Sequence, residues 1–189
     1  MSTSEIASAR AGPRLDPGSP GGQPGAARLR VESYRFGSIE VDAARIVRFV
    51  CPIVGFEELS TYALIVDEGS EPVLWLQALG APEVLFPVVD AGLVDETYTV
   101  DLTDEEVSSI GLDRADDARL LLVLTLDPAP SAVTANLRAP IVWNTRRATA
   151  MQVVRQDPTL SVSHPVGGTG GKCRSNKEVA RACPHTPQG

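Results

Sequence analysis

Apolar residues alternate with polar ones in short runs between residues 28 and 166, and these runs are rich in β-branched and aromatic side chains. A period of two is typical of strands that bury one face. Leu29–Ser33 and Ile39–Val41 flank Phe36-Gly37-Ser38, which predicts a first hairpin. Further strands are expected at Arg45–Phe49, Thr61–Val66, Val73–Gln77, Leu85–Val89, Thr97–Val100, Arg119–Leu126, Thr134–Leu137, Ile141–Asn144 and Ala150–Val154.

One short helix interrupts the strand pattern. Thr103 and Glu106 fit a capping box, in which the Thr103 hydroxyl accepts from the Glu106 backbone and the Glu106 side chain reaches back. Acidic residues favour this end of a helix, and Gly111 can take the positive φ that ends it. The whole pattern predicts a mainly β fold, an antiparallel β-barrel-like single domain with one short helix.

Composition predicts where the folded domain begins and ends. Nine of the fifteen residues from Ala11 to Gly25 are Gly or Pro. Such a segment buries too little apolar surface to offset its ordering entropy, so residues 1–27 are expected to form a disordered extension. Residues 167–189 begin with Gly-Gly-Thr-Gly-Gly and are expected to form a flexible tail. The β domain is therefore predicted over residues 28–166.

Charge narrows the classes of partner. The chain has 17 Lys and Arg against 24 Asp and Glu, a net charge of −7, but residues 31–166 alone hold 9 basic and 21 acidic residues. An acidic domain argues against direct binding to nucleic acid or to an anionic membrane. No apolar run is long enough to span a bilayer, no secretory signal is evident, and only Cys51 falls in the domain. A cytoplasmic protein is expected.

Residues that could carry catalysis or hold a metal are sparse. His164 is the one histidine of the predicted domain, and no second metal-ligand motif or nucleophile motif accompanies it. The carboxylates between Asp113 and Asp117 lack calcium-loop spacing, and Gly167–Cys173 lacks the pattern of a phosphate-binding loop. We therefore expect no enzyme, cofactor or metal. A small hydrolase using His164 and a carboxylate is the alternative.

Large aromatic residues stand beside amides at three places. Trp75 precedes Gln77 by two positions, Trp143 precedes Asn144, and Phe56 follows Gly55. Side chains of this kind fill a core in most proteins, but they also anchor bound peptides or helices. Both interpretations stay open at this point.

Several motifs from about Tyr34 to Val166 resemble one family in kind, order and spacing. They are Phe36-Gly37 with Ile39-Glu40-Val41, Gly55-Phe56-Glu57, Trp75-Leu76-Gln77, Phe86 with Val88-Val89-Asp90, Ala135-Asn136-Leu137-Arg138-Ala139-Pro140-Ile141-Val142, Asn144, Gln152-Val153-Val154 and His164-Pro165. This set resembles the FliW flagellar assembly factors. The chain departs from the family pattern at Val50 and Pro52, where a Pro and a Gly are usual, and at Ser163, where an Arg is usual.

The resemblance implies a non-enzymatic cytoplasmic protein, expected to be a monomer, that binds two proteins. One is flagellin, held before export, and the other is CsrA, an RNA-binding regulator that represses translation of flagellin mRNA. Flagellin that accumulates would occupy the protein and leave CsrA free to repress. Flagellin export would release the protein to bind CsrA, so that flagellin synthesis follows its export.

Charge and apolarity suggest which residues meet which partner. A basic RNA-binding protein suits the acidic segment Asp104–Asp117, whereas amphipathic flagellin segments suit Phe56 and its loop. The candidate partner-binding residues are Gly55, Phe56, Glu57, Trp75, Gln77, Asp104, Glu105, Glu106, Asn136, Arg138, Pro140, Asn144 and His164.

Overall fold

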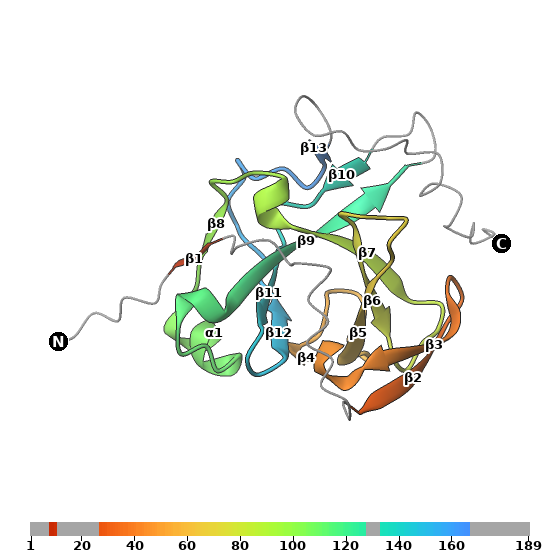
Figure 1. Ribbon diagram of the computed structural model, residues 1–189. Coiled ribbons are helices and arrows are strands. Elements are labelled where there is room, and N and C mark those ends of the chain that lie inside the picture. Colours follow the sequence, from red (N-terminus) through yellow and green to blue (C-terminus); the bar gives the residue numbers. More distant parts are fainter. Residues whose placement is uncertain (1–7, 11–26, 128–132, 167–189) are drawn as a thin grey trace.

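A closed β-barrel forms the centre of the molecule in the computed structural model, which describes residues 8–10, 27–127 and 133–166 (Figure 1). The strand order is β11-β12-β4-β5-β6-β7-β9, and β9 pairs back with β11 to close the barrel. Its strands are β4 (Ile46–Cys51), β5 (Thr61–Val66), β6 (Leu74–Ala78), β7 (Leu85–Asp90), β9 (Ala118–Leu126), β11 (Ile141–Asn144) and β12 (Thr149–Gln152). The predicted mainly β, barrel-like fold is confirmed.

One strand pair departs from the expected antiparallel arrangement. β12 runs parallel to β4, with Thr149 opposite Arg48 and Ala150 opposite Phe49, and the register shifts before Met151. The other pairs of the barrel are antiparallel. Parallel pairing needs a long connection, and here most of the domain lies between the two strands, so no local pattern predicts it.

Smaller elements surround the barrel. β10 (Val133–Ala135) and β13 (His164–Val166) extend the sheet beyond β9, while β2 (Arg28–Ser33) and β3 (Gly37–Asp42) form the predicted hairpin. Three short 3-10 helices, η1 (Ala43–Arg45), η2 (Ala91–Leu93) and η3 (Ala115–Asp117), connect strands.

The helix α1 (Asp104–Ser109) has the predicted capping box. The Glu106 N–H donates to Thr103 Oγ1 at 3.2 Å, and Thr103 N–H donates to Glu106 Oε2 at 2.7 Å. Gly111 follows the helix with φ +62°, as expected for the residue that ends it. Ile110 and Leu112 are buried beside it, which fixes the helix against the barrel.

Both faces of several barrel strands are buried. On β5, Tyr62 and Leu64 point into the barrel, whereas Ala63 and Ile65 pack under the β2–β3 hairpin. On β9, alternate leucines pack either inside the barrel or into the cluster that contains Ile110 beside α1. The barrel is therefore a fully packed core between two outer layers, and its surface chemistry lies in loops and helix ends.

A strand near the N-terminus corrects one expectation. β1 (Ser8–Arg10) lies within the extension predicted to be disordered, and it pairs antiparallel with β8 (Thr99–Asp101). Ala9 is buried against the cluster that contains Ile110. Residues 1–7, 11–26 and 167–189 lie outside the described residues, so disorder there stays a prediction.

No helix among the described residues is long and apolar enough to cross a membrane.

Candidate functional site

The loop between β4 and β5 has a fixed shape at its tip. Gly55 takes φ +86°, a conformation that favours glycine, and its N–H donates to the Glu57 carboxylate at 2.9 Å. Phe56 is half-buried and meets Phe86 edge to face, with the ring centroids 4.8 Å apart. Gly55 and Glu57 therefore shape the loop that carries Phe56, which remains partly accessible.

Gln152 joins this loop to a segment far away in sequence. Its Oε1 accepts from the Val54 N–H at 3.0 Å, and its Nε2 donates to the Ala139 carbonyl at 3.3 Å. Asn136 Oδ1 shapes the same segment by accepting from the N–H groups of Arg138 and Ala139, at 3.0 and 3.2 Å. The loop that carries Gly55 and Phe56 thus meets the segment that carries Asn136 and Arg138 at one end of β11 and β12.

Arg138 and Pro140 serve this junction mainly as structural residues. The Arg138 guanidinium is half-buried and donates to the Leu160 carbonyl at 3.0 and 3.2 Å. Pro140 is buried, and its carbonyl accepts from the Val153 N–H at 2.9 Å. Both residues hold the chain that follows β12 against the 136–140 turn.

Two exposed valines flank Gln152. Val54 is 67% exposed and Val154 is 50% exposed, whereas Val153 between Gln152 and Val154 is buried. Gln152 and Val154 therefore project from the same side of an extended segment. We call Val54, Phe56, Gln152 and Val154 the loop surface. Neither Val54 nor Val154 was among the predicted contact residues, although the motif Gln152-Val153-Val154 was an available signal for Val154.

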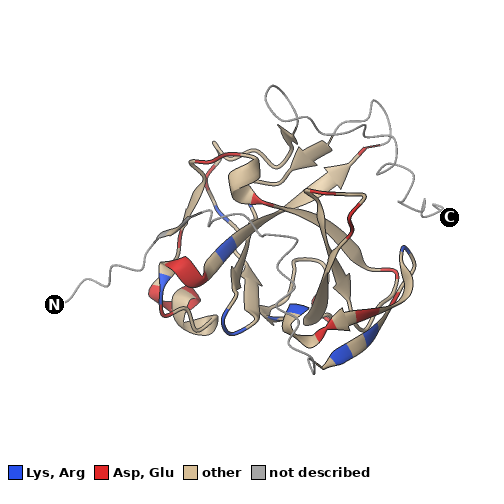
Figure 2. Cartoon of the chain, viewed as in Figure 1, with Lys and Arg blue, Asp and Glu red and all other residues tan. Residues whose placement is uncertain are grey.

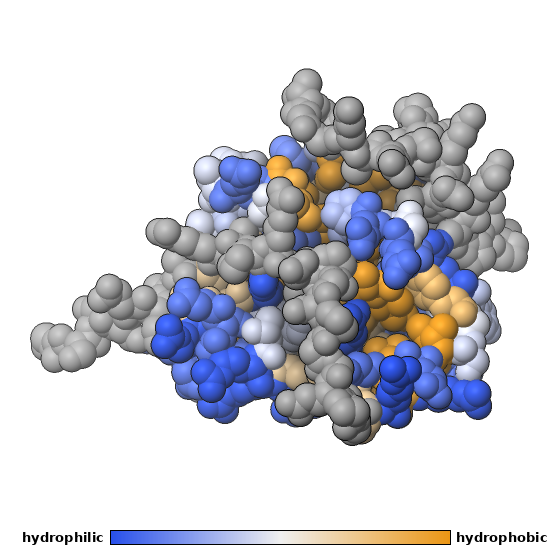
Figure 3. Space-filling model, viewed as in Figure 1, coloured by the Kyte–Doolittle hydropathy of each residue, from blue (hydrophilic) through white to orange (hydrophobic). Residues whose placement is uncertain are grey.

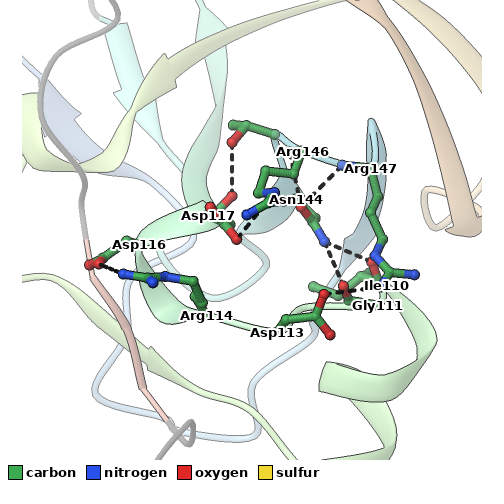
Figure 4. A network of polar contacts seen from close by, with 10 residues as sticks. Ile110, Gly111, Asp113, Arg114, Asp116, Asp117, Asn144, Arg146 and Arg147 are labelled. Atoms are coloured by element: carbon green, nitrogen blue, oxygen red, sulfur yellow. Dashed lines mark hydrogen bonds and ion pairs between the residues drawn. The ribbon is translucent and has the colours of Figure 1, made fainter.

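Asn144 organises the opposite end of β11 (Figure 4). Its side chain is 1% exposed; Nδ2 donates to the carbonyls of Ile110 and Gly111, at 3.1 and 2.9 Å. Its Oδ1 accepts from the N–H groups of Arg146 and Arg147, at 3.0 and 3.3 Å. Asn144 thus ties the end of α1 to the β11–β12 turn and has no free group for a partner, which corrects its prediction as a contact residue.

Ion pairs neutralise one part of the acidic segment between Asp104 and Asp117. Asp113 pairs with Arg147 at 3.0 Å, Asp116 with Arg114 at 3.3 Å, and Asp117 with Arg146 at 3.9 Å (Figure 4). These pairs lie at or near the surface, where each contributes little to stability but neutralises much of the local charge.

The first turn of α1 keeps its negative charge. Asp104 and Glu105 are exposed and form no ion pair with the side chains that the structure describes. Glu106 is half-buried in the capping box, so its role is structural. Asp101, at the end of β8, is also exposed. We call Asp101, Asp104 and Glu105 the acidic surface; Figure 2 shows the acidic colour gathered on α1.

The loop surface and the acidic surface lie at opposite ends of β11 and β12. Gln152 pairs with Ile141 at one end, and Thr149 pairs with Asn144 at the other. The three residue steps between these two ends span about 10 Å. In Figure 3 the region over α1 is hydrophilic, whereas apolar side chains gather over β6 and β7. Because the loop surface exposes Val54 and Val154 and the acidic surface exposes carboxylates, the chain presents two chemically different surfaces.

Trp75 and Gln77 belong to the core, which corrects their prediction as contact residues. Trp75 is buried under the hairpin, where its Nε1 donates to Ser70 Oγ at 2.9 Å and the Arg35 guanidinium lies 4.1 Å from its ring centroid. Gln77 Nε2 donates to backbone carbonyls that include Val84 at 3.0 Å. Both side chains are thus used within the fold.

His164 lies in β13, opposite Ala135, and is separate from both surfaces defined above. The hydrogen bonds from Thr97, and to a lesser extent the charge of His164, lower the pKa of Asp95. A cavity of about 330 Å³ lies elsewhere, between β3 and β5, and neither His164 nor Asp95 lines it. The described residues contain no group of three or more His, Cys, Asp or Glu that could hold a metal ion.

The Glu57 contact predicts a pH-dependent loop. The Gly55 N–H lowers the pKa of Glu57 below its ordinary value. Because the folded-state pKa is the lower one, the contact stabilises the loop above the ordinary pKa and is lost as the pH falls through the lowered value. A carboxyl NMR titration should give Glu57 a pKa below the ordinary value of a glutamate. The Gly55 amide resonance should titrate with Glu57, and an ordinary Glu57 pKa would contradict this.

Comparisons with known proteins agree with this architecture. The family model described as FliW protein matches residues 30–166. A flagellar assembly factor FliW of Syntrophus aciditrophicus is 33% identical over 138 residues, which cover 73% of this chain and 87% of that protein. Another, from Geotalea uraniireducens, is 34% identical over 147 residues, covering 78% and 90%.

A solved structure supports the same assignment. The crystal structure of a flagellar assembly factor FliW superposes with a TM-score of 0.65 at 28% sequence identity, covering 74% of this chain and 98% of that one. The matched region contains the barrel and both surfaces, whereas β1 precedes the segment that the family model matches. On the strength of the matched sequence and the shared fold, the chain belongs to the FliW family of flagellar assembly factors.

Proposed function

We propose that this chain acts in the cytoplasm as a binding protein for flagellin and for the translational regulator CsrA. By sequestering CsrA it antagonises the repression of flagellin translation, and by binding flagellin it becomes unavailable to CsrA. It works as a monomer through stoichiometric complexes rather than turnover. The main support is the pair of surfaces of opposite chemistry at the two ends of β11 and β12.

The loop surface suits flagellin. Amphipathic segments bind through apolar side chains that enter a partner's apolar surface. Val54 and Val154 offer exposed aliphatic groups, and Phe56 offers an aromatic edge beside them. Gln152 adds an amide whose two ends are already held by backbone groups, so the surface is organised before a partner arrives.

The acidic surface suits CsrA. Asp104 and Glu105 lie in the first turn of α1, are exposed, and lack ion-pair partners among the described side chains. Complementary charge mainly raises the association rate and excludes partners of like charge. An acidic protein would therefore capture a basic RNA-binding protein while rejecting RNA itself.

Separate surfaces constrain how one partner displaces the other. Flagellin and CsrA need not compete for the same atoms, because their surfaces lie at opposite ends of β11 and β12, which span about 10 Å. For one partner to exclude the other, the two proteins must clash sterically when both are bound, or binding at one surface must lower the affinity of the other surface. β11 and β12 supply a direct connection, since Gln152 and Asn144 each cross-link these strands' ends to neighbouring segments.

Charge reversal on α1 tests the CsrA assignment. The double variant Asp104→Lys, Glu105→Lys is expected to lower the association rate with CsrA about tenfold and to flatten its dependence on salt. Stopped-flow or surface plasmon resonance from about 50 to about 500 mM salt measures both, because the Debye length falls about threefold over that range. Glu106 is left intact so that the capping box persists.

A matched control separates location from net charge. Glu68→Lys, Glu83→Lys makes the same change in charge at two exposed residues outside the acidic surface, and it should retain most of the wild-type association rate. Equal loss in both double variants would show that only net charge matters. Wild-type kinetics in the Asp104, Glu105 variant would refute the acidic surface as the CsrA site.

A further inference from the structure

We propose that strand β1 is an intramolecular strap that competes with the basic partner for access to the acidic surface. The inference rests on the proposed function, because the partner concerned is the one assigned to that surface. It adds a regulatory device: CsrA must displace the strap before it can dock fully.

The register of β1 brings it next to the acidic surface. Ser8 lies opposite Asp101, Ala9 opposite Val100 and Arg10 opposite Thr99. Asp101 is itself part of the acidic surface, and α1 begins three residues later. β1 also contacts η3, which carries Asp116, and Figure 4 shows the strand running past that residue. A partner that engages Asp101 and Asp104 together therefore meets β1.

The strand is built to detach without loss of the barrel. It pairs over only three residues and its pairing partner β8 belongs to a separate two-stranded sheet. Ala9 is 1% exposed, yet its single methyl group buries little apolar surface. The segment matched by the family model begins at residue 30, so β1 is an addition to the matched domain.

Charge and connectivity make the segment a suitable competitor. Residues 1–14, which include β1, contain 2 basic residues and 1 acidic residue, whereas residues 31–166 carry a net charge of −12. The segment around β1 therefore has the same sign of charge as the partner that it would exclude. Because it belongs to the same chain, it competes at an effective concentration that is commonly about millimolar.

Release of the strap should tighten CsrA binding. Ala9→Glu puts a longer, charged side chain at a position buried among apolar residues and should undock β1. If the strap is docked in about nine of ten molecules, its release lowers the apparent Kd for CsrA about tenfold. Ser19→Glu is the control, because it adds the same charge to the extension outside β1. Full-length chains are compared by isothermal titration calorimetry.

Two further measurements separate strap docking from partner binding. Amide hydrogen exchange at residues 99–101 should accelerate in Ala9→Glu and not in Ser19→Glu. A synthetic peptide of residues 1–14, added to the Ala9→Glu chain, should slow this exchange again and reverse the gain in CsrA affinity. Unchanged exchange would overturn the strap.

Equal CsrA affinity of the wild-type and Ala9→Glu chains, with exchange altered, would overturn the competition. No complex with CsrA for any of the three chains would instead overturn the proposed function itself, and the exchange and peptide results would still decide whether the strap docks.

Discussion

The double variant Val54→Asp, Val154→Asp is expected to lose about 3 kcal/mol of flagellin binding, a rise of about a hundredfold in Kd. Both valines are exposed in the free chain and flank Gln152. A complex with flagellin would bury them, so the variant loses apolar contact and must also desolvate two carboxylates. Titration calorimetry or size exclusion with purified flagellin measures the loss.

A second pair of substitutions controls for added charge and lost surface apolarity. Leu29 and Leu93 are each 42% exposed and lie on β2 and η2, outside the loop surface. Leu29→Asp, Leu93→Asp should bind flagellin as the wild type does. The Val54, Val154 variant should also keep its affinity for CsrA. Wild-type flagellin affinity in that variant would refute the loop surface as the flagellin site.

Local sequence signals predicted the elements of the fold well. The capping box of Thr103 and Glu106 placed the only α-helix among the described residues, and Gly111 took the expected positive φ. Strand periodicity placed β5 and β11 at their observed bounds. Such signals depend on hydrogen bonds and dihedral angles within a few residues, so they can be recognised without knowledge of the tertiary structure.

Features that depend on distant contacts were not predictable. The parallel pairing of β12 with β4 joins segments about a hundred residues apart. β1 was missed because it contributes one small buried side chain, Ala9, and its pairing depends entirely on β8. No strand pattern marks the segment, because its pairing with β8 needs only backbone groups.

The candidate site shows the same division. The predicted contact residues included Phe56 and Arg138, and the structure brings their segments together through Gln152. The motif Gln152-Val153-Val154 was visible in the sequence, but no local pattern indicated that its first side chain joins these two segments. The predicted contact residues also included Trp75 and Gln77, which are buried within the fold. A motif shared with a family shows that its residues matter to that family. It does not distinguish a side chain that stabilises the fold from one that contacts a partner.

Asn144→Ala tests this distinction directly. The substitution is expected to lower the free energy of unfolding by about 3 kcal/mol, because it leaves the Ile110 and Gly111 carbonyls and two backbone N–H groups without their buried partner. The midpoint of thermal unfolding should fall by about 10 °C. Urea and thermal denaturation followed by circular dichroism measure both quantities.

Asn136→Ala is the matched control, since that half-buried amide accepts two N–H groups but donates to none of the described groups. It should cost about 1 kcal/mol. Because Asn144 also sets the position of the α1 C-terminus, its loss should weaken CsrA binding only as far as the acidic surface becomes disordered. Wild-type stability combined with lost CsrA binding would make Asn144 a contact residue after all, and would place the partner's surface at the β11–β12 turn rather than at the first turn of α1.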